Sequence, residues 1–218
     1  MKKPSLTAER QRPSFAEEKI LKAQGYRLIA GIDEVGRGAL AGPVVAAAVI
    51  LPYPINAPWL SQVKDSKQLS PARREFLFHH IHEVAISLGI GMADHEVIDA
   101  QGIIRATRLA MKSAIDQLSP PPESLLIDCM QLPEVPLPQK GITNGDELCL
   151  SIACASIIAK VTRDKLMIEF DGIYPGYGLA DHKGYGTRQH LSCLHRLGPC
   201  LIHRQSFQPV KDVIYQEK

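Results

Sequence analysis

The residues of this chain best suited to chemistry are acids that lie beside apolar stretches. Asp33 follows the run LIAGI, Asp128 follows LLI, and Asp146 stands at the start of a long apolar segment. Side chains at the ends of neighbouring strands meet at one edge of a sheet. If the strands that end at Asp33 and Asp128 are neighbours, these three acids converge there, with Glu34 beside them.

A cluster of this kind has a strong requirement for positive charge. Two ionised carboxylates about 4 Å apart repel by roughly 4 kcal/mol at an effective dielectric constant near 20. The acids must therefore be partly protonated or hold cations. Because every candidate is a hard oxygen donor, the matching ions are Mg²⁺ or Mn²⁺, and two such ions about 3.5 to 4 Å apart suit phosphodiester hydrolysis. A single acid at a strand end is more often a solvated terminus, so Asp33 and Glu34 alone would not support a metal site.

The glycine-bracketed arginine that follows bears on the geometry of the first two acids. A regular strand points successive side chains to opposite faces, so Asp33 and Glu34 can share a site only if the chain bends there. Gly36 and Gly38 permit such a bend and leave backbone N–H groups unshielded. Arg37 supplies a planar fork that suits phosphate. As an isolated tripeptide, however, this pattern is typical of many surface turns.

The elements that must position these residues follow from the apolar pattern and its breakers. Two strands, at 28–32 and 44–51, are joined by a glycine-rich turn, which predicts a hairpin. The second is a continuous apolar run, typical of a strand covered on both faces. A short helix is predicted to open with a capping box at 14–17 and to close at Gly25. A second helix has Ser70 as its cap, Pro71 at its first position and Gly89 at its end. The remaining predicted elements are a strand at 85–92, helices at 95–100 and 103–118, a strand at 124–130, and a helix at 146–170.

The predicted order of elements indicates the fold class. The helix at 146–170 is apolar around most of its circumference and is lined with Ala, Ser and Cys, so it can lie close against a sheet. Along the chain, the predicted strands come first, and strands and helices then alternate. This order indicates a mixed sheet with helices packed on it. With 218 residues, 45% of them hydrophobic, the chain can bury one sizeable core. We therefore expect one α/β domain with a C-terminal extension.

Composition limits the compartment and the kind of site. The longest apolar run, at 39–51, is interrupted by Gly42 and Pro43 and is shorter than the ~20 residues that span a bilayer. The N-terminal segment has no apolar signal-peptide core. Five cysteines without a C-x-x-C pair argue against a disulfide framework and against a zinc ribbon. These features predict a cytoplasmic protein.

Charge is unevenly distributed in the C-terminal part, although the net charge of the chain is only +2. No acid lies between Asp181 and Asp212. The basic residues in that interval are Lys183, Arg188, Arg196, Arg204 and Lys211. This asymmetry indicates a surface that faces a polyanion such as nucleic acid. An ordinary solvated helix face explains the charge alone equally well.

Several motifs, taken in order, make a family resemblance specific. They are GIDEVGRGALAGPVVAAAVIL, DSKQLS, LLIDCM, GDELCLSIACASIIAKVTRD, HKGYGTRQH and LGPCLIHRQSFQPV. Together they resemble the successive motifs of type 2 ribonuclease H, the bacterial ribonuclease HII, over most of residues 28–211. The resemblance implies a ribonuclease H-like α/β fold, a mixed sheet flanked by helices with a C-terminal helical extension. It also implies metal-dependent cleavage of RNA in RNA–DNA hybrids and at single ribonucleotides embedded in duplex DNA.

The resemblance assigns roles to individual residues. The catalytic and metal-binding carboxylates of the family fall on Asp33, Glu34, Asp128 and Asp146, with two Mg²⁺ or Mn²⁺ ions in the active complex. The ribonucleotide-sensing loop falls on Gly36, Arg37 and Gly38. The tyrosine that reads the RNA-to-DNA junction falls on Tyr185, and Lys67 in the DSK motif matches a basic position near the phosphate.

The same resemblance divides the chain. Residues 28–171 are expected to form the catalytic core, and residues 172–218 a substrate-contacting extension of the same domain. Residues 1–27 form an N-terminal lead with a short helix and no assigned function. The related type 3 enzymes share the carboxylates and the loop but carry an additional N-terminal substrate-binding domain. The 27 residues before the first strand are too few for that domain, so type 2 is favoured.

We therefore expect a monomeric endonuclease that cuts on the 5′ side of a ribonucleotide and leaves 3′-hydroxyl and 5′-phosphate ends. Two other functions fit part of the pattern. One is a glycosidase that uses Asp33 or Glu34 with Asp128 as acid and as nucleophile or base. The other is a non-catalytic nucleic-acid-binding module built on the glycine loop and the basic C-terminal segment. The sequence leaves open the physiological metal, the preference between single ribonucleotides and long hybrids, and the binding of protein partners such as a sliding clamp.

Overall fold

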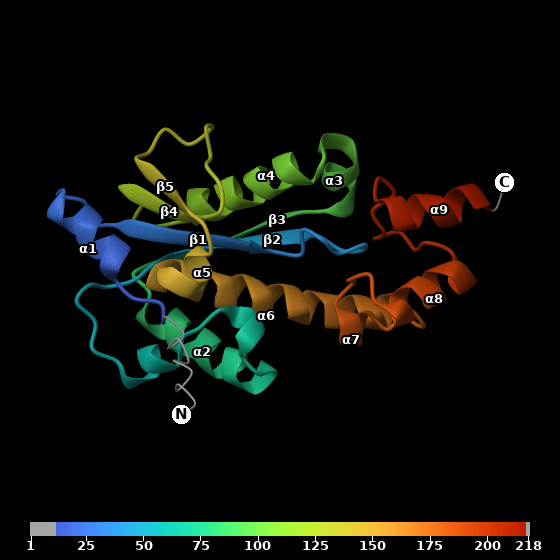
Figure 1. The fold of residues 1–218 in the computed structure, drawn as a ribbon, viewed down its shortest axis with the longest axis horizontal. Coiled ribbons are helices and arrows are strands. Elements are labelled where there is room, and N and C mark those ends of the chain that lie inside the picture. Colours follow the sequence, from blue (N-terminus) through green and yellow to red (C-terminus); the bar gives the residue numbers. More distant parts are fainter. Residues whose placement is uncertain (1–11, 217–218) are drawn as a thin grey trace, which may run out of the picture.

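A five-stranded mixed sheet forms the centre of the computed structural model, which describes residues 12–216 (Figure 1). The strands are β1 (Ile29–Val35), β2 (Val44–Ile50), β3 (Ser87–Ala93), β4 (Ser124–Asp128) and β5 (Gln139–Ile142). Across the sheet their order is β3-β2-β1-β4-β5. β2 is antiparallel to both β1 and β3, whereas β4 runs parallel to β1 and to β5. The predicted hairpin and the predicted mixed sheet are therefore confirmed.

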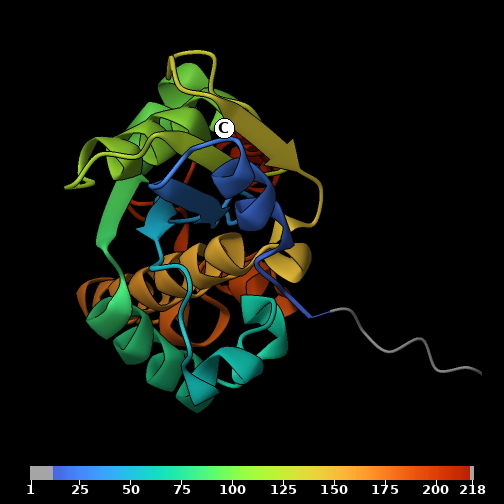
Figure 2. The ribbon, with the colours of Figure 1, turned by 90° about the vertical axis from the view of Figure 1, so that its left-hand side faces the viewer.

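Helices cover both faces of this sheet. They are α1 (Ala16–Ala23), α2 (Pro71–Val84), α3 (His95–Gln101), α4 (Ile103–Asp116), α5 (Gly145–Leu148), α6 (Leu150–Ile173), α7 (Leu179–His182), α8 (Arg188–Leu197) and α9 (Gln208–Gln216), with short 3-10 helices η1 (Pro58–Gln62) and η2 (Ser66–Gln68). α4 packs on one face, and α6 and α2 lie on the other (Figure 2). Every residue of β2 is buried between these layers, which explains its continuous apolar sequence.

Small residues let the helices approach the sheet closely. A Cβ atom at Gly31 in β1 would lie 2.2 Å from the backbone carbon of Ser151 in α6. On the opposite face, a Cβ atom at Gly89 or Gly91 in β3 would lie 2.0 Å from a carbonyl oxygen of α4. Glycine is required where two backbones come this close. The close contact predicted between the long helix and the sheet is therefore confirmed.

Two predicted helix boundaries are wrong. α2 ends at Val84 rather than at Gly89, because Gly89 lies inside β3. The capping box predicted at the start of α1 does not form, since Phe15 is the N-cap residue and no side chain caps the helix. Ser70 does cap α2, by accepting the backbone N–H of Arg73 at 3.3 Å. The error at α2 arose because glycine in a strand and glycine after a helix look alike in sequence.

The long helix predicted at 146–170 is two helices, because Cys149 adopts an extended conformation between α5 and α6. At this break, the N–H of Leu150 donates to the Ser14 carbonyl oxygen at 3.1 Å. The Glu18 carboxylate accepts the N–H of Ser151 at 2.9 Å. Partners from the N-terminal segment therefore satisfy the first turn of α6, and α5 becomes a separate turn.

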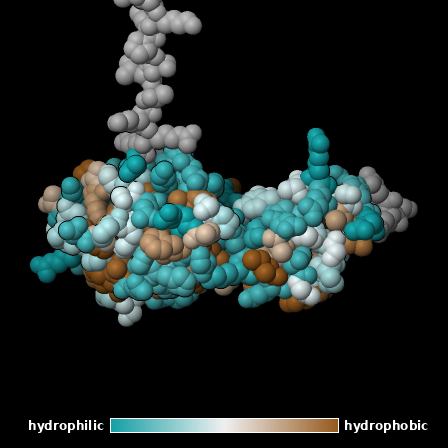
Figure 3. Space-filling model, turned by 90° about the horizontal axis from the view of Figure 1, so that it is seen from below, coloured by the Kyte–Doolittle hydropathy of each residue, from teal (hydrophilic) through white to brown (hydrophobic). Residues whose placement is uncertain are grey.

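The C-terminal helices α7, α8 and α9 lie beyond one end of the sheet, at the right of Figure 1, which confirms the predicted helical extension. Seen from below, the outline narrows between the larger end, which holds the sheet, and this smaller end, and hydrophilic residues predominate on that face (Figure 3). Among the helices of residues 12–216, none combines the length and the apolar character that a bilayer span requires. Residues 1–11 of the expected N-terminal lead lie outside the described part of the chain.

Candidate active site

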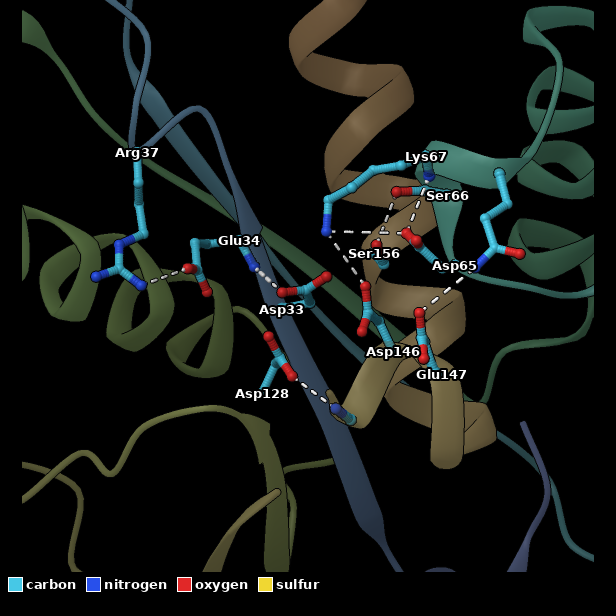
Figure 4. A network of polar contacts seen from close by, with 12 residues as sticks. Asp33, Glu34, Arg37, Asp65, Ser66, Lys67, Asp128, Asp146, Glu147 and Ser156 are labelled. Atoms are coloured by element: carbon cyan, nitrogen blue, oxygen red, sulfur yellow. Dashed lines mark hydrogen bonds and ion pairs between the residues drawn. The ribbon is translucent and has the colours of Figure 1, made fainter. Parts of the chain in front are cut away.

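The sheet brings Asp33 and Asp128 to the same edge. β1 and β4 are parallel, and their register pairs the two residues that directly precede these acids. Asp146 comes from α5, which follows the neighbouring strand β5, and both Asp33 and Asp146 are buried. Figure 4 shows these three side chains and that of Glu34 around one space, where β1, β4 and α5 meet. The convergence predicted for the acids is present in the structure.

Glu34 reaches this space without the bend that was predicted from Gly36 and Gly38. β1 stays in regular register with β2 through Val35, so Asp33 and Glu34 point to opposite sides of the strand. Asp128 lies near enough to both to raise the pKa of each. Glu34 also forms an ion pair with Arg37, with 3.1 Å between Oε1 and Nη1. The acids therefore approach one space from two sides of β1.

Each acid is held by a different partner. Oδ1 of Asp33 accepts the N–H of the next residue at 2.7 Å, and Oδ1 of Asp128 accepts the N–H of Gly145 at 2.7 Å. Oδ2 of Asp146 lies 3.4 Å from Nζ of Lys67. As the side chains are oriented, no three His, Cys, Asp or Glu residues within the described range 12–216 are grouped closely enough to hold a metal ion. The carboxylates must turn toward one another to share one.

The electrostatics of the acids favour a cation. Burial raises the pKa of Asp33 well above its usual range, and the charges of Glu34 and Asp128 raise it further. Burial also raises the pKa of Glu34, although Arg37 opposes the change. The pKa of Asp146 is raised, again mainly by burial. Ionised carboxylates are therefore unfavourable at this edge, and a bound divalent cation would offset that cost.

One carboxylate oxygen of the cluster has no partner among the described residues. Oε2 of Glu34 is buried and accepts no hydrogen bond from residues 12–216. A buried carboxylate oxygen without a donor or a cation is unfavourable. The acids around it offer only hard oxygen ligands, which Mg²⁺ and Mn²⁺ prefer. The donor set therefore fits a divalent metal ion.

The turn that carries Lys67 brings in another acid, Asp65, which was not among the predicted site residues. Asp65 is buried, its Oδ1 accepts the backbone N–H of Lys67 at 3.0 Å, and the same atom lies 3.8 Å from Nζ. The hydroxyl of Ser66 lies 2.8 Å from that of Ser156 and ties the turn to α6. Partial burial lowers the pKa of Lys67, but Asp146 and Asp65 raise it, and the net change is upward. The DSK motif was the available signal, because Asp65 is its first residue.

The loop at 36–38 has one packed side and one open side. Gly36 has a φ of +93°, and a Cβ atom there would lie 2.2 Å from Nε of Arg163 in α6. A Cβ atom at Gly38 would have no neighbour within 4 Å, and Gly38 is exposed. The side chain of Arg37 is 41% exposed. Gly36 is therefore required by the fold, whereas Gly38 leaves room for a ligand.

Arg204 fixes this loop from inside the protein. Its guanidinium is fully buried and donates to the carbonyl oxygens of Gly36 at 2.7 Å, Arg37 at 2.8 Å and Gly42 at 2.8 Å. The expectation that Arg204 belongs to a polyanion-facing surface is therefore wrong, whereas Arg188 is exposed as expected. No local signal separates these two arginines, because the carbonyl groups that Arg204 binds come from a segment far away in the sequence.

The contacts of Arg204 also orient the backbone donors of the loop. In a trans peptide the C=O and the following N–H point in opposite directions. The carbonyl groups of Gly36 and Arg37 point toward Arg204, so the N–H groups of Arg37 and Gly38 point away from it. Successive N–H groups directed to one side of a loop are suited to bind an anion or a hydroxyl oxygen.

Tyr185 lies beside the same loop. Its backbone forms a bridge with Ala39, and the N–H of Leu40 donates to the Gly184 carbonyl oxygen at 2.8 Å. The guanidinium carbon of Arg163 lies 5.5 Å from the centre of the Tyr185 ring, within the range of a cation–π contact. The residue is partly exposed. The structure thus brings Tyr185 next to the glycine-bracketed loop.

Comparisons with known proteins show what this chain is similar to. The family model described as Ribonuclease HII matches residues 30–210. The chain is 57% identical over 202 residues to a Ribonuclease HII of Dehalococcoides mccartyi, covering 93% of this chain and 95% of the relative. The crystal structure of the ribonuclease H2 from Pyrococcus horikoshii OT3 matches with a TM-score of 0.73 at 23% identity, over 86% of this chain and 97% of that one. Bst-RNase HIII in complex with Mn²⁺ matches with a TM-score of 0.68 at 18% identity, over 94% and 82%. The two structural similarities concern the fold.

Proposed function

The chain belongs to the ribonuclease HII family, and from this premise we propose that it is an endonuclease that hydrolyses the RNA strand of RNA–DNA hybrids. The proposal includes single ribonucleotides embedded in duplex DNA, which the enzyme cuts on their 5′ side. The observation that carries the proposal is the convergence of Asp33, Glu34, Asp128 and Asp146 at one sheet edge (Figure 4).

In this proposal the four acids hold two Mg²⁺ or Mn²⁺ ions. The support is the raised pKa values of Asp33, Glu34 and Asp146, together with the unpartnered Oε2 of Glu34 and the all-oxygen donor set. A structure of similar fold, Bst-RNase HIII, is described in complex with Mn²⁺. When bound, such ions supply Lewis-acid stabilisation of the negative charge that develops on the reacting phosphate. Lys67, beside Asp146, adds a further positive charge at this edge.

The reaction is a hydrolysis of the bond between phosphorus and the 3′-oxygen. Water attacks phosphorus in line with that bond, and the 3′-oxygen leaves and takes up a proton. The products are a 3′-hydroxyl and a 5′-phosphate. In this arrangement Arg37, ion-paired with Glu34, can offer its guanidinium to a phosphate oxygen, since its side chain is 41% exposed.

Recognition of the ribonucleotide involves the loop and Tyr185. The N–H groups of Arg37 and Gly38 donate to the oxygens of the ribonucleotide and its phosphate. The ring of Tyr185 stacks on the following sugar, where a 2′-hydroxyl would crowd the aromatic face, so a deoxyribose is preferred there. The target is then defined by the sugars, and no base needs to be read.

The proposal extends to the organisation of the chain. Residues 28–171 act as the catalytic core, and residues 172–218 act as a substrate-contacting extension of the same domain. The contact between Ala39 and Tyr185 supports the assignment of both parts to one domain, because it joins the loop of the core to the extension. We also propose that the protein is a monomer and acts in the cytoplasm.

One experiment separates this function from the alternatives. The full chain is incubated with an end-labelled RNA–DNA hybrid in Mg²⁺ or Mn²⁺, and in excess chelator, and the product ends are identified. We expect internal cuts with 3′-hydroxyl and 5′-phosphate ends in the presence of metal alone. A hybrid left intact in both metals would favour a binding module. Activity on a glycoside that persists in chelator would favour the glycosidase.

A further inference from the structure

Three buried histidines lie behind Tyr185 and take no part in the proposed reaction. His182 ends α7, His190 lies in the first turn of α8, and His203 directly precedes Arg204. The rings of His182 and His190 stack with their centroids 4.3 Å apart and 14° between their planes. Nε2 of His190 lies 3.0 Å from Nε2 of His203. We call these residues the histidine cluster.

Hydrogen bonds to the backbone assign a tautomer to two of these rings. Nδ1 of His203 lies 3.0 Å from the backbone nitrogen of Cys200 and 3.1 Å from its Sγ. Because the backbone N–H can only donate, Nδ1 accepts and the proton is on Nε2. Nδ1 of His190 lies 3.0 Å from the Tyr185 carbonyl oxygen, so it donates. Nε2 of His190 is then free to accept from Nε2–H of His203. The hydrogen bonds run in one direction, from Cys200 through both rings to Tyr185.

The third ring fixes the other side of Tyr185. Nε2 of His182 lies 2.8 Å from the Tyr177 carbonyl oxygen and donates to it. Nδ1 of His182 then accepts the N–H of Gly184 at 3.2 Å. His182 therefore holds the backbone directly before Tyr185, and His190 holds the carbonyl group of Tyr185 itself.

The tautomers of His190 and His203 require uncharged rings, and the burial of both residues favours the uncharged form. Burial lowers the pKa of His190. Burial, together with the neighbouring His190, lowers the pKa of His203 to about 4. A charged His190 would have no lone pair to accept from His203. At neutral pH the chain of hydrogen bonds can therefore form as described.

The chain of hydrogen bonds ends at Tyr185, which is the residue that the proposed function places on the substrate. The Tyr185 carbonyl accepts from His190 and from the N–H of Thr187, the latter at 2.8 Å. Thr187 is the N-cap residue of α8, and its hydroxyl accepts the N–H of His190 at 3.2 Å. Tyr185 is thereby tied to the first turn of α8, although its ring stays partly exposed beside the glycine loop.

We propose that His190 is a positioning residue for recognition of the RNA-to-DNA junction, because its Nδ1–H holds the Tyr185 carbonyl and so sets the place of the ring that stacks on the substrate. This inference rests on the proposed function. A histidine that only stabilised the fold would affect cleavage of every substrate alike. A positioning histidine affects the junction more than uniform RNA, since the stacking contact favours a deoxyribose after the cut site.

Two substitutions of one residue separate these roles. The amide nitrogen of His190→Asn takes the place of Nδ1 and can still donate to Tyr185. The longer side chain of His190→Gln places its amide near Nε2, where it can accept from His203 but no longer reaches Tyr185. Both variants lose the ring and its stacking on His182, so the cost to packing is shared. The readout is kcat/KM on a DNA duplex with one ribonucleotide divided by kcat/KM on a uniform RNA–DNA hybrid.

We expect His190→Asn to keep this ratio within about twofold of the parent and His190→Gln to lower it roughly 2- to 10-fold, the effect of one net hydrogen bond. Equal ratios for the two variants, or a parental ratio for His190→Gln, would overturn the inference. A parent that cuts neither substrate would instead overturn the proposed function, on which the inference depends.

A second measurement needs neither a variant nor activity. Long-range ¹H–¹⁵N NMR spectra of the full chain at pH 7 distinguish protonated from unprotonated ring nitrogens. We expect His190 to carry its proton on Nδ1 and His182 and His203 to carry theirs on Nε2. A proton on Nε2 of His190 would remove the hydrogen bond to Tyr185 and overturn the inference, even if both variants failed to fold.

Discussion

Asp33 and Asp128 place negative charge where the fold provides little to balance it. Burial and the neighbouring acids raise the pKa of Asp33, so its ionised form costs free energy in the metal-free protein. We expect Asp33→Asn and Asp128→Asn to abolish cleavage of an RNA–DNA hybrid, because each removes a proposed metal ligand. Without metal they should melt no lower than the parent, since the substitution relieves repulsion. Cleavage assays in Mg²⁺ and thermal unfolding in chelator measure the two effects.

Asp94 offers a matched control for these variants. It caps α3 by accepting the N–H of Val97 at 2.9 Å, a role that asparagine also performs. Asp94→Asn therefore removes one charge outside the site and should retain parental cleavage. Near-normal cleavage by Asp33→Asn or Asp128→Asn would remove that residue from the active site.

Tyr185 carries the proposed preference for a deoxyribose after the cut. Its ring is partly exposed, with Arg163 at 5.5 Å from the ring centre. We expect Tyr185→Ala to lose roughly 5-fold to 150-fold in cleavage at an RNA-to-DNA junction, which corresponds to a stacking contact of about 1 to 3 kcal/mol. Tyr185→Phe keeps the ring and should lose less. Rates for both variants on a junction duplex and on uniform hybrid check this. If alanine and phenylalanine behave alike, the stacking role is wrong.

At the scale of elements, Arg188 and Arg204 differ in what surrounds them. Arg188 begins α8 and is exposed, whereas Arg204 is buried among loop carbonyl groups. If the exposed face of α8 contacts the substrate, Arg188→Ala should lower the slope of log binding constant against log salt concentration by about one, with an unchanged melting temperature. Arg204→Ala leaves buried carbonyl groups without donors and should lower the melting temperature by at least about 4 °C.

Duplex binding at several salt concentrations, together with thermal unfolding, tests both arginines. A parental salt slope for Arg188→Ala would mean that this face of α8 is an ordinary solvated surface. A parental melting temperature for Arg204→Ala would contradict its role in holding the loop. Arg188 serves as the control for Arg204, because the same substitution at an exposed position should not affect unfolding.

The order and type of the elements could be predicted because each has a local cause. The all-buried β2 shows as an unbroken apolar run, and Ser70 with Pro71 marks the start of α2. The break at Cys149 could not be predicted, because it depends on pairing with Ser14 and on the Glu18 carboxylate. Contacts between segments this far apart leave no local pattern in a single sequence.

The same distinction applies to the site. The convergence of Asp33 and Asp128 could be predicted, since both stand at the ends of apolar strands that prove to be parallel neighbours. The roles of these acids stay a prediction. The buried Asp65 was missed although its motif was noted, and the burial of Arg204 could not be seen. Long-range hydrogen bonds decide whether an arginine faces solvent or holds a loop.

For the whole molecule, the histidine cluster predicts a pH dependence of stability. The pKa of His203 is lowered from 6.5 to about 4, mainly by burial, so the unfolded chain binds more protons between these values. The contribution of neutral His203 to the free energy of unfolding is fully present above pH 6.5 and is lost as the pH falls toward 4. Relative to His203→Gln, the parent should lose roughly 1.4 kcal/mol of unfolding free energy per pH unit in the middle of this window.

Denaturant unfolding in chelator at several pH values between 7 and 4.5 measures this difference. The raised pKa values of Asp33, Glu34 and Asp146 change the free energy of unfolding in the opposite direction as the pH falls. This change is the same in the parent and the variant, so it cancels when the two are compared. A curve for His203→Gln that runs parallel to that of the parent would contradict the buried, neutral state assigned to His203.

A cleavage map of a single duplex tests the proposed active site most directly. The substrate is a labelled DNA strand with one internal ribonucleotide, paired with its DNA complement, and an all-DNA duplex of the same sequence is the control. In Mg²⁺ or Mn²⁺ we predict one cut, on the 5′ side of the ribonucleotide, with a 3′-hydroxyl end. Excess chelator or the Asp33→Asn substitution should abolish that cut, and the control duplex should stay intact. A cut that persists in chelator, or an intact substrate after incubation of the parent with either metal, would contradict a metal-dependent ribonucleotide-cleaving site at this edge of the sheet.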